Sequence, residues 1–287
     1  MPTPKLKNVS RFLFVAIVTV PVVSGMVYAA LYSLGIIGIL NTEISSKAWQ
    51  TVFFGKPFWS AIGFSLYISV VSMAISLAVA LLISIKWQKN LRDGLLGTAI
   101  YFPLCFPGTV MAFFSFQMLS KSGFVSRLGF NMGWIEDLRV FPSWIHDAYG
   151  IGIIFTSVLL ITPFFIILFS NLFKTENIAS FQHLAKTFGA SNRQILWKVT
   201  LPILLKRASV TIYLFTIFIM GSYEVPLLLG RQDPQMISVA IIQKIQRFNL
   251  NDIPQGYAMS ILYVLLILSV VILLFFRNKN FFKTSAV

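Results

Sequence analysis

Residues that could carry out acid–base or nucleophilic chemistry are few and scattered in this sequence. Only 9 of its 287 residues are Asp or Glu, and it has 2 histidines and 1 cysteine. No paired carboxylates and no nucleophile–base arrangement suggest catalysis, and His146 and His183 are too widely separated for a metal site. The segment Gly55-Lys56-Pro57 is not a nucleotide-binding loop, because it lacks the required glycine spacing and has Pro where Ser or Thr must follow the Lys. We therefore expect no enzyme activity, no metal site and no cofactor bound by this chain itself.

Glu224 is the acidic residue closest to the interior of an apolar segment. Intramembrane acids are functional candidates because a charge inside a bilayer is costly. Two interpretations stay open: the carboxylate takes part in substrate passage or gating, or it reaches water or bonds backbone freed by Pro226. We assign Glu224 to a candidate substrate path or gate, together with polar residues of the apolar segments: Ser65, Ser69, Ser72, Thr216, Ser222 and Tyr223.

One apolar segment carries a continuous face of small residues that recur every three or four positions. Its members are Ser65, Ser69, Ser72, Ser76, Ala80 and Ser84. A face of this kind lets the backbones of two helices approach closely. It could instead line a substrate path, and helix packing is the interpretation that we favour.

Six apolar segments must position these residues, and each is near or above the roughly 20 residues that cross a bilayer as a helix. Apolar residues make up 57% of the sequence and charged residues 11%, outside the usual composition of globular proteins. We expect one transmembrane domain over residues 1–287 with a core at about 58–276, and an all-α fold because nothing suggests the alternating strands of a barrel. The expected spans are Phe12–Leu34, Phe58–Ile85, Leu96–Leu119, Gly150–Phe173, Ala208–Leu229 and Tyr257–Phe276.

Charged residues orient these six segments. With both termini in the cytoplasm, 15 of the 23 Lys and Arg residues lie on the cytoplasmic side, as the positive-inside rule requires. The net charge of +14 therefore indicates topology and not a nucleic-acid site. The basic start followed by Val27-Tyr28-Ala29 would also suit a cleaved signal peptide, but apolar character continues to Leu40 and we expect an uncleaved anchor.

Two segments on the expected outer side have features of their own. Residues 120–149 contain Trp134 and Trp144, which suits a folded cap at the membrane interface. Ile237, Ile241, Ile245 and Phe248 recur at helical spacing and predict a short amphipathic helix. This helix is an interfacial anchor or a moving gate, and we favour the anchor.

The cytoplasmic loop at about 174–205 predicts two short helices. Phe181, Leu184, Ala185 and Phe188 form one apolar stripe at helical spacing, with Ser180 suited to cap its start and Gly189 to end it. Ser191 and Gln194 then predict a capping box for a second helix from Asn192 to Thr200, after which Leu201-Pro202 turns the chain back toward the membrane. Helices this short need a docking surface, either their own bundle or a partner protein.

This loop resembles the EAA loop of the permeases of binding-protein-dependent ABC importers (type I importers). The motif has Glu-Ala-Ala, three residues, Gly, nine residues and Ile-x-Leu-Pro. The chain matches at Ala185, Gly189 and Leu201-Pro202, has Val199 for Ile, and departs from the motif with His183-Leu184 in place of Glu-Ala. The spacing and the position before the penultimate span are kept.

The resemblance extends beyond this loop. Residues 102–109, with Pro103 and Pro107-Gly108, are similar to the third span of the family, and Thr162-Pro163-Phe164 is similar to its fourth. The segment from Gly221 to Gly230 resembles the exit of the fifth span in the branch that carries polyamines, iron and phosphonates.

The resemblance implies a permease subunit of the bacterial inner membrane that moves a small polar solute into the cytoplasm. It implies as partners a pair of ATP-binding subunits that hold ATP and Mg²⁺, a second permease copy or paralogue, and an extracytoplasmic binding protein. It further implies that a coupling helix docks on the ATPase. The expected ATPase-coupling residues are Phe181, Gln182, His183, Leu184, Ala185, Lys186, Phe188, Gly189, Leu201 and Pro202.

Two other classes of membrane protein fit the sequence less well. A secondary transporter or channel driven by an ion gradient usually shows intramembrane acids or broken helices at matching positions of two repeats. This sequence shows one such acid and no repeat. A membrane-embedded enzyme should carry a cluster of polar catalytic residues at the end of a span, and none stands out.

Overall fold

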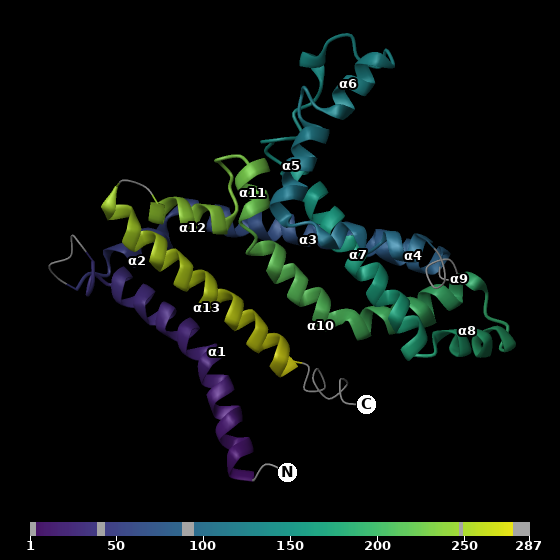
Figure 1. Cartoon of the computed structure of the whole chain (residues 1–287), viewed down its shortest axis with the longest axis horizontal. Helices are drawn as coiled ribbons and strands as arrows, with labels where there is room; N and C mark the ends of the chain where they lie inside the picture. Colours follow the sequence, from purple (N-terminus) through teal and green to yellow (C-terminus); the bar gives the residue numbers. More distant parts are fainter. Residues whose placement is uncertain (1–3, 39–43, 88–94, 247–248, 278–287) are drawn as a thin grey trace. The chain divides into compact units, whose positions relative to one another are not determined.

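The structure is a computed structural model that describes residues 4–38, 44–87, 95–246 and 249–277. Within these ranges the chain is helical and contains no strand, so the expected all-α class is confirmed (Figure 1). Phe248 of the expected amphipathic helix lies outside the described residues. So do six of the charged residues of the chain: Lys89, Arg92, Asp93, Arg247, Lys279 and Lys283.

Five helical segments in the described part of the chain are long and apolar enough to cross a membrane. A sixth crossing is formed if a bent pair of helices is counted as one span. The five segments are Ser10–Ser33, Lys56–Lys86, Ile151–Thr175, Asn192–Met220 and Leu250–Leu274.

The chain divides into two compact units, one formed by residues 1–59 and 240–287 and the other by residues 60–239. The first unit contains α1 (Pro4–Ser33), α2 (Lys47–Phe54), the short helix η4 (Leu250–Asp252) and α13 (Ile253–Arg277). Helices α3 (Lys56–Lys86) and α12 (Ile237–Gln246) begin in one unit and continue into the other.

In the first unit, α1 and α2 both pack on α13. The rings of Tyr28, Tyr32 and Tyr257 pack together with centroids 4.8–6.0 Å apart. The indole of Trp49 on α2 donates a hydrogen bond to the hydroxyl of Ser33 at 3.0 Å. The tyrosine rings therefore join α1 to α13, and the hydrogen bond joins α2 to the end of α1.

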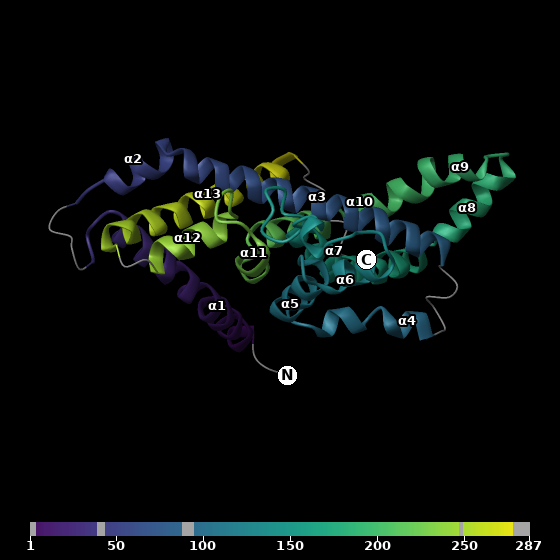
Figure 2. The same cartoon turned by 90° about the horizontal axis from the view of Figure 1, so that it is seen from above.

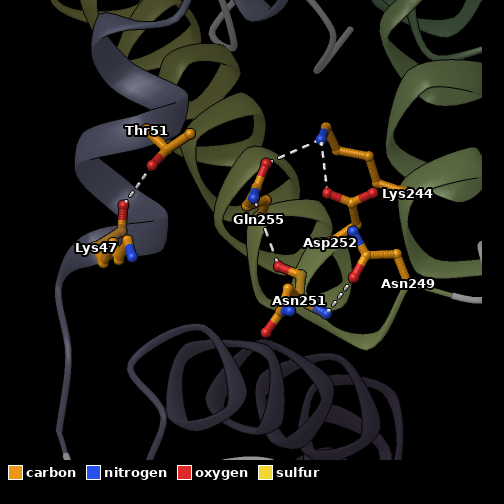
Figure 3. Close-up of polar contacts among 7 residues, drawn as sticks. All are labelled: Lys47, Thr51, Lys244, Asn249, Asn251, Asp252 and Gln255. Carbon is orange, nitrogen blue, oxygen red and sulfur yellow. Dashed lines mark hydrogen bonds and ion pairs between the residues drawn. The ribbon is translucent and has the colours of Figure 1, made fainter.

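Figure 3 shows how the turn between α12 and α13 is closed. Lys244 donates to Oε1 of Gln255 at 2.8 Å and forms an ion pair with Asp252 at 3.5 Å. Gly256 allows α13 to approach α12, since a Cβ there would lie 2.7 Å from Ile245. The amphipathic pattern thus correctly predicts a helix, and its described residues are buried or half-buried in this chain except Gln246.

In the second unit, the serine face of α3 is fully buried, as helix packing requires. Ser84 donates to the carbonyl oxygen of Ile166 on α7 (Ile151–Thr175) at 3.3 Å. The hydroxyl of Ser65 accepts a hydrogen bond from the backbone N–H of Ile237 at 2.8 Å. Side chains from α7 such as Phe165 and Phe169 complete the core together with Leu204.

The third expected span, Leu96–Leu119, is not one straight helix. Its two parts, Gly97–Cys105 and Gly108–Asn131, meet at an angle of 99°. Pro107 explains the break, because it removes a backbone donor and forces Phe106 into an extended conformation at ψ 132°. The elements are α4 (Leu95–Ala99), η1 (Phe102–Cys105), α5 (Gly108–Leu119), α6 (Phe124–Asn131) and the short helix η2 (Leu138–Val140).

The fifth span also differs from the prediction, which placed it at Ala208–Leu229. α9 (Asn192–Ile195), the π-helical turn η3 (Leu196–Thr200) and α10 (Leu201–Met220) form one continuous helix. The chain then breaks, and α11 (Glu224–Leu229) follows.

The expected second loop helix therefore does not end at Thr200. The amide of Leu201 donates to the carbonyl of Leu196, five residues back, and this wider turn accommodates Pro202, which has no amide hydrogen. Leu201-Pro202 lies inside a helix where a turn toward the membrane was expected.

Candidate functional site

Helix α8 (Ile178–Thr187) follows α7 after a two-residue turn, at the end of α7 and α10 that lies away from α5 and α11 (Figures 1 and 2). It begins earlier than expected, so Ser180 is not its N-cap. Asn177 takes the cap position in a left-handed conformation with φ 47°, and the backbone amide of Ser180 donates a hydrogen bond to the carbonyl of Asn177 at 3.0 Å. The side chain of Ile178 is fully buried, and this apolar anchor explains the earlier start.

Gly189 ends α8 as expected. It adopts φ +79°, its amide donates to the carbonyl of Lys186 at 2.9 Å, and the next amide, of Ala190, donates to Ala185 at 3.0 Å. These two bonds form a complete Schellman motif. The capping box between Ser191 and Gln194 is confirmed and starts α9 directly after this turn.

The apolar stripe of α8 faces away from the chain. The exposed fraction of the side chains is 51% for Phe181, 55% for Leu184 and 82% for Phe188. Ala185 is half-buried. Large apolar side chains grouped on one helix face mark an interaction surface when they are left exposed.

The opposite side of α8 is fixed to the start of α10. Gln182 donates from Nε2 to the hydroxyl of Thr200 at 2.9 Å. At the end of α7, Glu176 forms an ion pair with Arg207 on α10 at 2.9 Å. The short helix is therefore held as a rigid projection of α7 and α10.

We expect Thr200→Val to lower the free energy of unfolding by about 1 kcal/mol, because the isosteric side chain cannot accept from Gln182. The matched control is Thr216→Val. It removes a hydrogen bond that the Thr216 hydroxyl donates to the carbonyl of Ile212 within α10, and no contact between helices. The midpoint of heat-induced loss of folded protein in detergent should fall further for Thr200→Val. Equal midpoints would show that the bond does not stabilise the loop.

The expected substrate-path residues are placed in three environments. Ser65, Ser69 and Ser72 are fully buried in the α3 packing face. Thr216 is half-buried on α10. Ser222 and Tyr223 form the break before α11, where the Ser222 carbonyl accepts a hydrogen bond from the hydroxyl of Ser238. Their role in a substrate path stays a prediction.

Glu224 is placed at the junction of the two broken spans. Its Oε2 accepts a hydrogen bond from the backbone amide of Thr109, in the first turn of α5, at 3.1 Å. A Cβ on Gly108 would lie 3.3 Å from the same oxygen, so the glycine makes room for the carboxylate. Glu224 therefore bonds free backbone of α5 and not the backbone freed by Pro226, and its role in substrate passage or gating stays a prediction.

His146 contacts the end of α11, and the sequence did not indicate this contact. Its backbone amide donates to the carbonyl of Leu229 at 3.0 Å, and its ring Nδ1 lies 2.7 Å from the carbonyl oxygen of Gly230. The residue has φ 57°. The side chain of the next residue, Asp147, caps α7 by accepting a hydrogen bond from the backbone amide of Ile151 at 2.9 Å. An Asp just before a helix is a signal of an ordered cap, but it does not predict which residues His146 contacts.

The family described as binding-protein-dependent transport system inner membrane component matches residues 73–283. The chain belongs to this family. It is 25% identical over 273 residues to the probable ABC transporter permease protein y4fN of Sinorhizobium fredii (strain NBRC 101917 / NGR234). That match covers 90% of this chain and 43% of the relative, so the chain spans less than half of the relative's length.

Two solved structures share the fold. One is a bacterial ABC transporter involved in the import of the acidic polysaccharide alginate, with a TM-score of 0.65 and 18% identity over 97% of this chain and 99% of that one. The other is a bacterial alginate ABC transporter in complex with a periplasmic protein bound to an alginate pentasaccharide. Its TM-score is 0.63, with 17% identity over 98% of each chain.

Proposed function

We propose that this chain is the membrane-spanning permease subunit of an ATP-driven ABC importer. Membership of the family of inner-membrane transport components and the helical spans support this function. The sequence has no nucleotide-binding loop, so ATP and Mg²⁺ are held by a separate pair of ATPase subunits. A second permease copy or paralogue completes the pathway through the membrane.

The exposed apolar stripe of α8 is the observation that carries this proposal. Phe181, Leu184 and Phe188 project from a helix that is fixed by its back face and its two ends. Aromatic anchors that fill a pocket of a partner provide much of the binding energy of an interface. When the ATPase subunits close, a rigid α8 transmits their movement to α7 and α10.

An extracytoplasmic binding protein delivers a small polar solute to the side of the membrane opposite α8. The structure of the alginate transporter with its periplasmic protein supports this arrangement by analogy of fold. An ion-gradient-driven transporter is less well supported, because such proteins carry matching features in two repeats.

The test is the amount of ATPase subunit that co-purifies with the full chain from its native host. We expect Phe188→Ala to reduce this amount at least about tenfold, because truncating an aromatic hot spot weakens binding by about 2 kcal/mol or more. Phe54→Ala on α2 is the matched control, since Phe54 is 81% exposed and Phe188 is 82% exposed.

A photo-crosslinking residue at position 188 should also capture a subunit that contains a nucleotide-binding loop. The proposal is wrong if Phe188→Ala and Phe54→Ala retain the same amount of ATPase. It is equally wrong if the crosslinker captures no such subunit in intact cells.

A further inference from the structure

Helix α11 is short and is held by hydrogen bonds at both ends. It follows the break at Gly221–Tyr223, which ends α10, and it lies beside α5 (Figure 1). Val225, Pro226 and Leu229 are buried, so its body is also packed. A segment of six residues is too short to keep a position by helix formation alone, and its contacts must fix it.

The first end of α11 is held by the carboxylate of Glu224. The first amides of a helix have no partner within the helix, and they attract negative charge. The residue before α5 is Pro107, which has no polar side chain to cap that helix. Glu224 supplies the missing acceptor from another element, at 3.1 Å from the Thr109 nitrogen.

The second end of α11 is held by His146. The carbonyls of Leu229 and Gly230 are the groups that a helix end leaves unpaired, and His146 binds both of them. Because a carbonyl oxygen can only accept, Nδ1 of the ring carries the proton and donates. The left-handed backbone of His146 brings its amide and its ring to the same end of α11.

We propose that Glu224 and His146 are positioning residues that clamp α11 at both ends and thereby hold the resting conformation of the permease. Glu224 acts through α5 and is not a ligand for the solute. This inference rests on the proposed function and adds a regulatory contact to it.

The clamp joins two places where a membrane span is interrupted. Thr109 follows the break in the third span, and Glu224 follows the break in the fifth. Irregular backbone at membrane depth occurs where it is buried in protein or lines a cavity. A movement that separates α5 from α11 must therefore release the Glu224 contact. A movement that keeps this contact must carry α5 and α11 together.

The first test measures whether α11 leaves its seat when the clamp is removed. Cys105 is replaced by Ser, and Val225, which is 6% exposed, is replaced by Cys as a reporter. The rate of maleimide labelling is then measured in membrane fragments that are open on both sides. Ala208→Cys on α10, at 1% exposure in the parent chain, reports general loosening.

Matched substitutions separate the bonds from the shapes of the side chains. Glu224→Met keeps the length of the side chain without an acceptor, whereas Glu224→Gln keeps an acceptor. His146→Asp and His146→Asn both tolerate the left-handed backbone, but only Asn can donate to Gly230. Thr109→Ala is a further control, since the donor at that position is the backbone amide.

We expect Glu224→Met and His146→Asp to raise labelling of Cys at position 225 about tenfold and to leave Cys at position 208 unchanged. Glu224→Gln, His146→Asn and Thr109→Ala should stay within about threefold of the parent rate. Unchanged labelling at position 225, or an equal rise at position 208, would overturn the clamp.

The second test uses the complete complex with its co-purified ATPase. Release of the clamp should raise ATP hydrolysis in the absence of solute several-fold, with the amount of bound ATPase unchanged. An unchanged or lower rate would contradict a role in the resting state. If instead Glu224 binds solute, Glu224→Met raises the KM for uptake and leaves labelling unchanged. Absence of any co-purifying ATPase would defeat the proposed function, while the labelling test of the clamp would still stand.

Discussion

Replacing Gly189 with Val is expected to reduce solute uptake more than tenfold while the protein still inserts into the membrane. Gly189 ends α8 at φ +79°, a conformation that costs non-glycine residues about 1–2 kcal/mol and β-branched residues more. The two bonds of the Schellman motif depend on this conformation. When they are lost, α8 and α9 change their relative direction and the apolar stripe no longer meets its partner.

At Gly189 an added Cβ would cause backbone strain but no steric overlap. A Cβ at this position would have no heavy atom within 4 Å, so any loss of function comes from the backbone. Gly189→Asn is the matched control, because Asn tolerates the left-handed conformation, and it should retain most of the uptake. Uptake and ATPase co-purification are measured for both variants. Equal uptake in Gly189→Val and Gly189→Asn would show that the turn does not transmit movement.

The sequence predicted the parts of the fold that depend on local patterns. Apolar length identified the spans, and the small residues of α3 are buried, as a packing face requires, with Ser84 bonded to α7. The spacing around Gly189 identified the end of α8, because the left-handed turn needs a glycine there. These features follow from residues close together in the chain.

Contacts between distant residues could not be predicted from the sequence. The third span was expected as one segment, and its bend of 99° depends on how α5 packs on α7 and α11. Ser180 has the right residue type for an N-cap, yet burial of Ile178 starts α8 three residues earlier. The bond between Glu224 and Thr109 joins residues 115 positions apart, and no local pattern encodes it.

Gly150 combines a left-handed backbone with close neighbours, so a single methyl group there should destabilise the fold strongly. It precedes α7 with φ +66°, and a Cβ would overlap Cδ1 of Ile68 and lie 3.2 Å from Cζ of Phe64. Ile68 is fully buried in the core, so its side chain must shift against packed neighbours to make room. Strain of about 1–2 kcal/mol and overpacking of about 1–3 kcal/mol both act. We expect Gly150→Ala to lower the free energy of unfolding by about 3 kcal/mol.

A double-mutant cycle with Ile68→Val can divide this loss into its two causes. Valine lacks the Cδ1 atom that a Cβ at position 150 would overlap, and Ile68→Val alone should cost about 1 kcal/mol. The loss of stability in the double variant should be smaller than the sum of the two single losses by more than about 1 kcal/mol, so the double variant should be more stable than Gly150→Ala alone. The backbone strain remains in it, so recovery is partial.

Gly189→Ala provides the reference for strain without crowding, since both glycines are left-handed and only Gly150 is enclosed. We therefore expect the lowest midpoint of heat-induced unfolding in detergent for Gly150→Ala. The double variant with Ile68→Val should have a higher midpoint, and Gly189→Ala the highest of the three. Strict additivity of Gly150→Ala and Ile68→Val would contradict the overlap. If it held, the close approach of α3 to the start of α7 would not be what requires glycine at position 150.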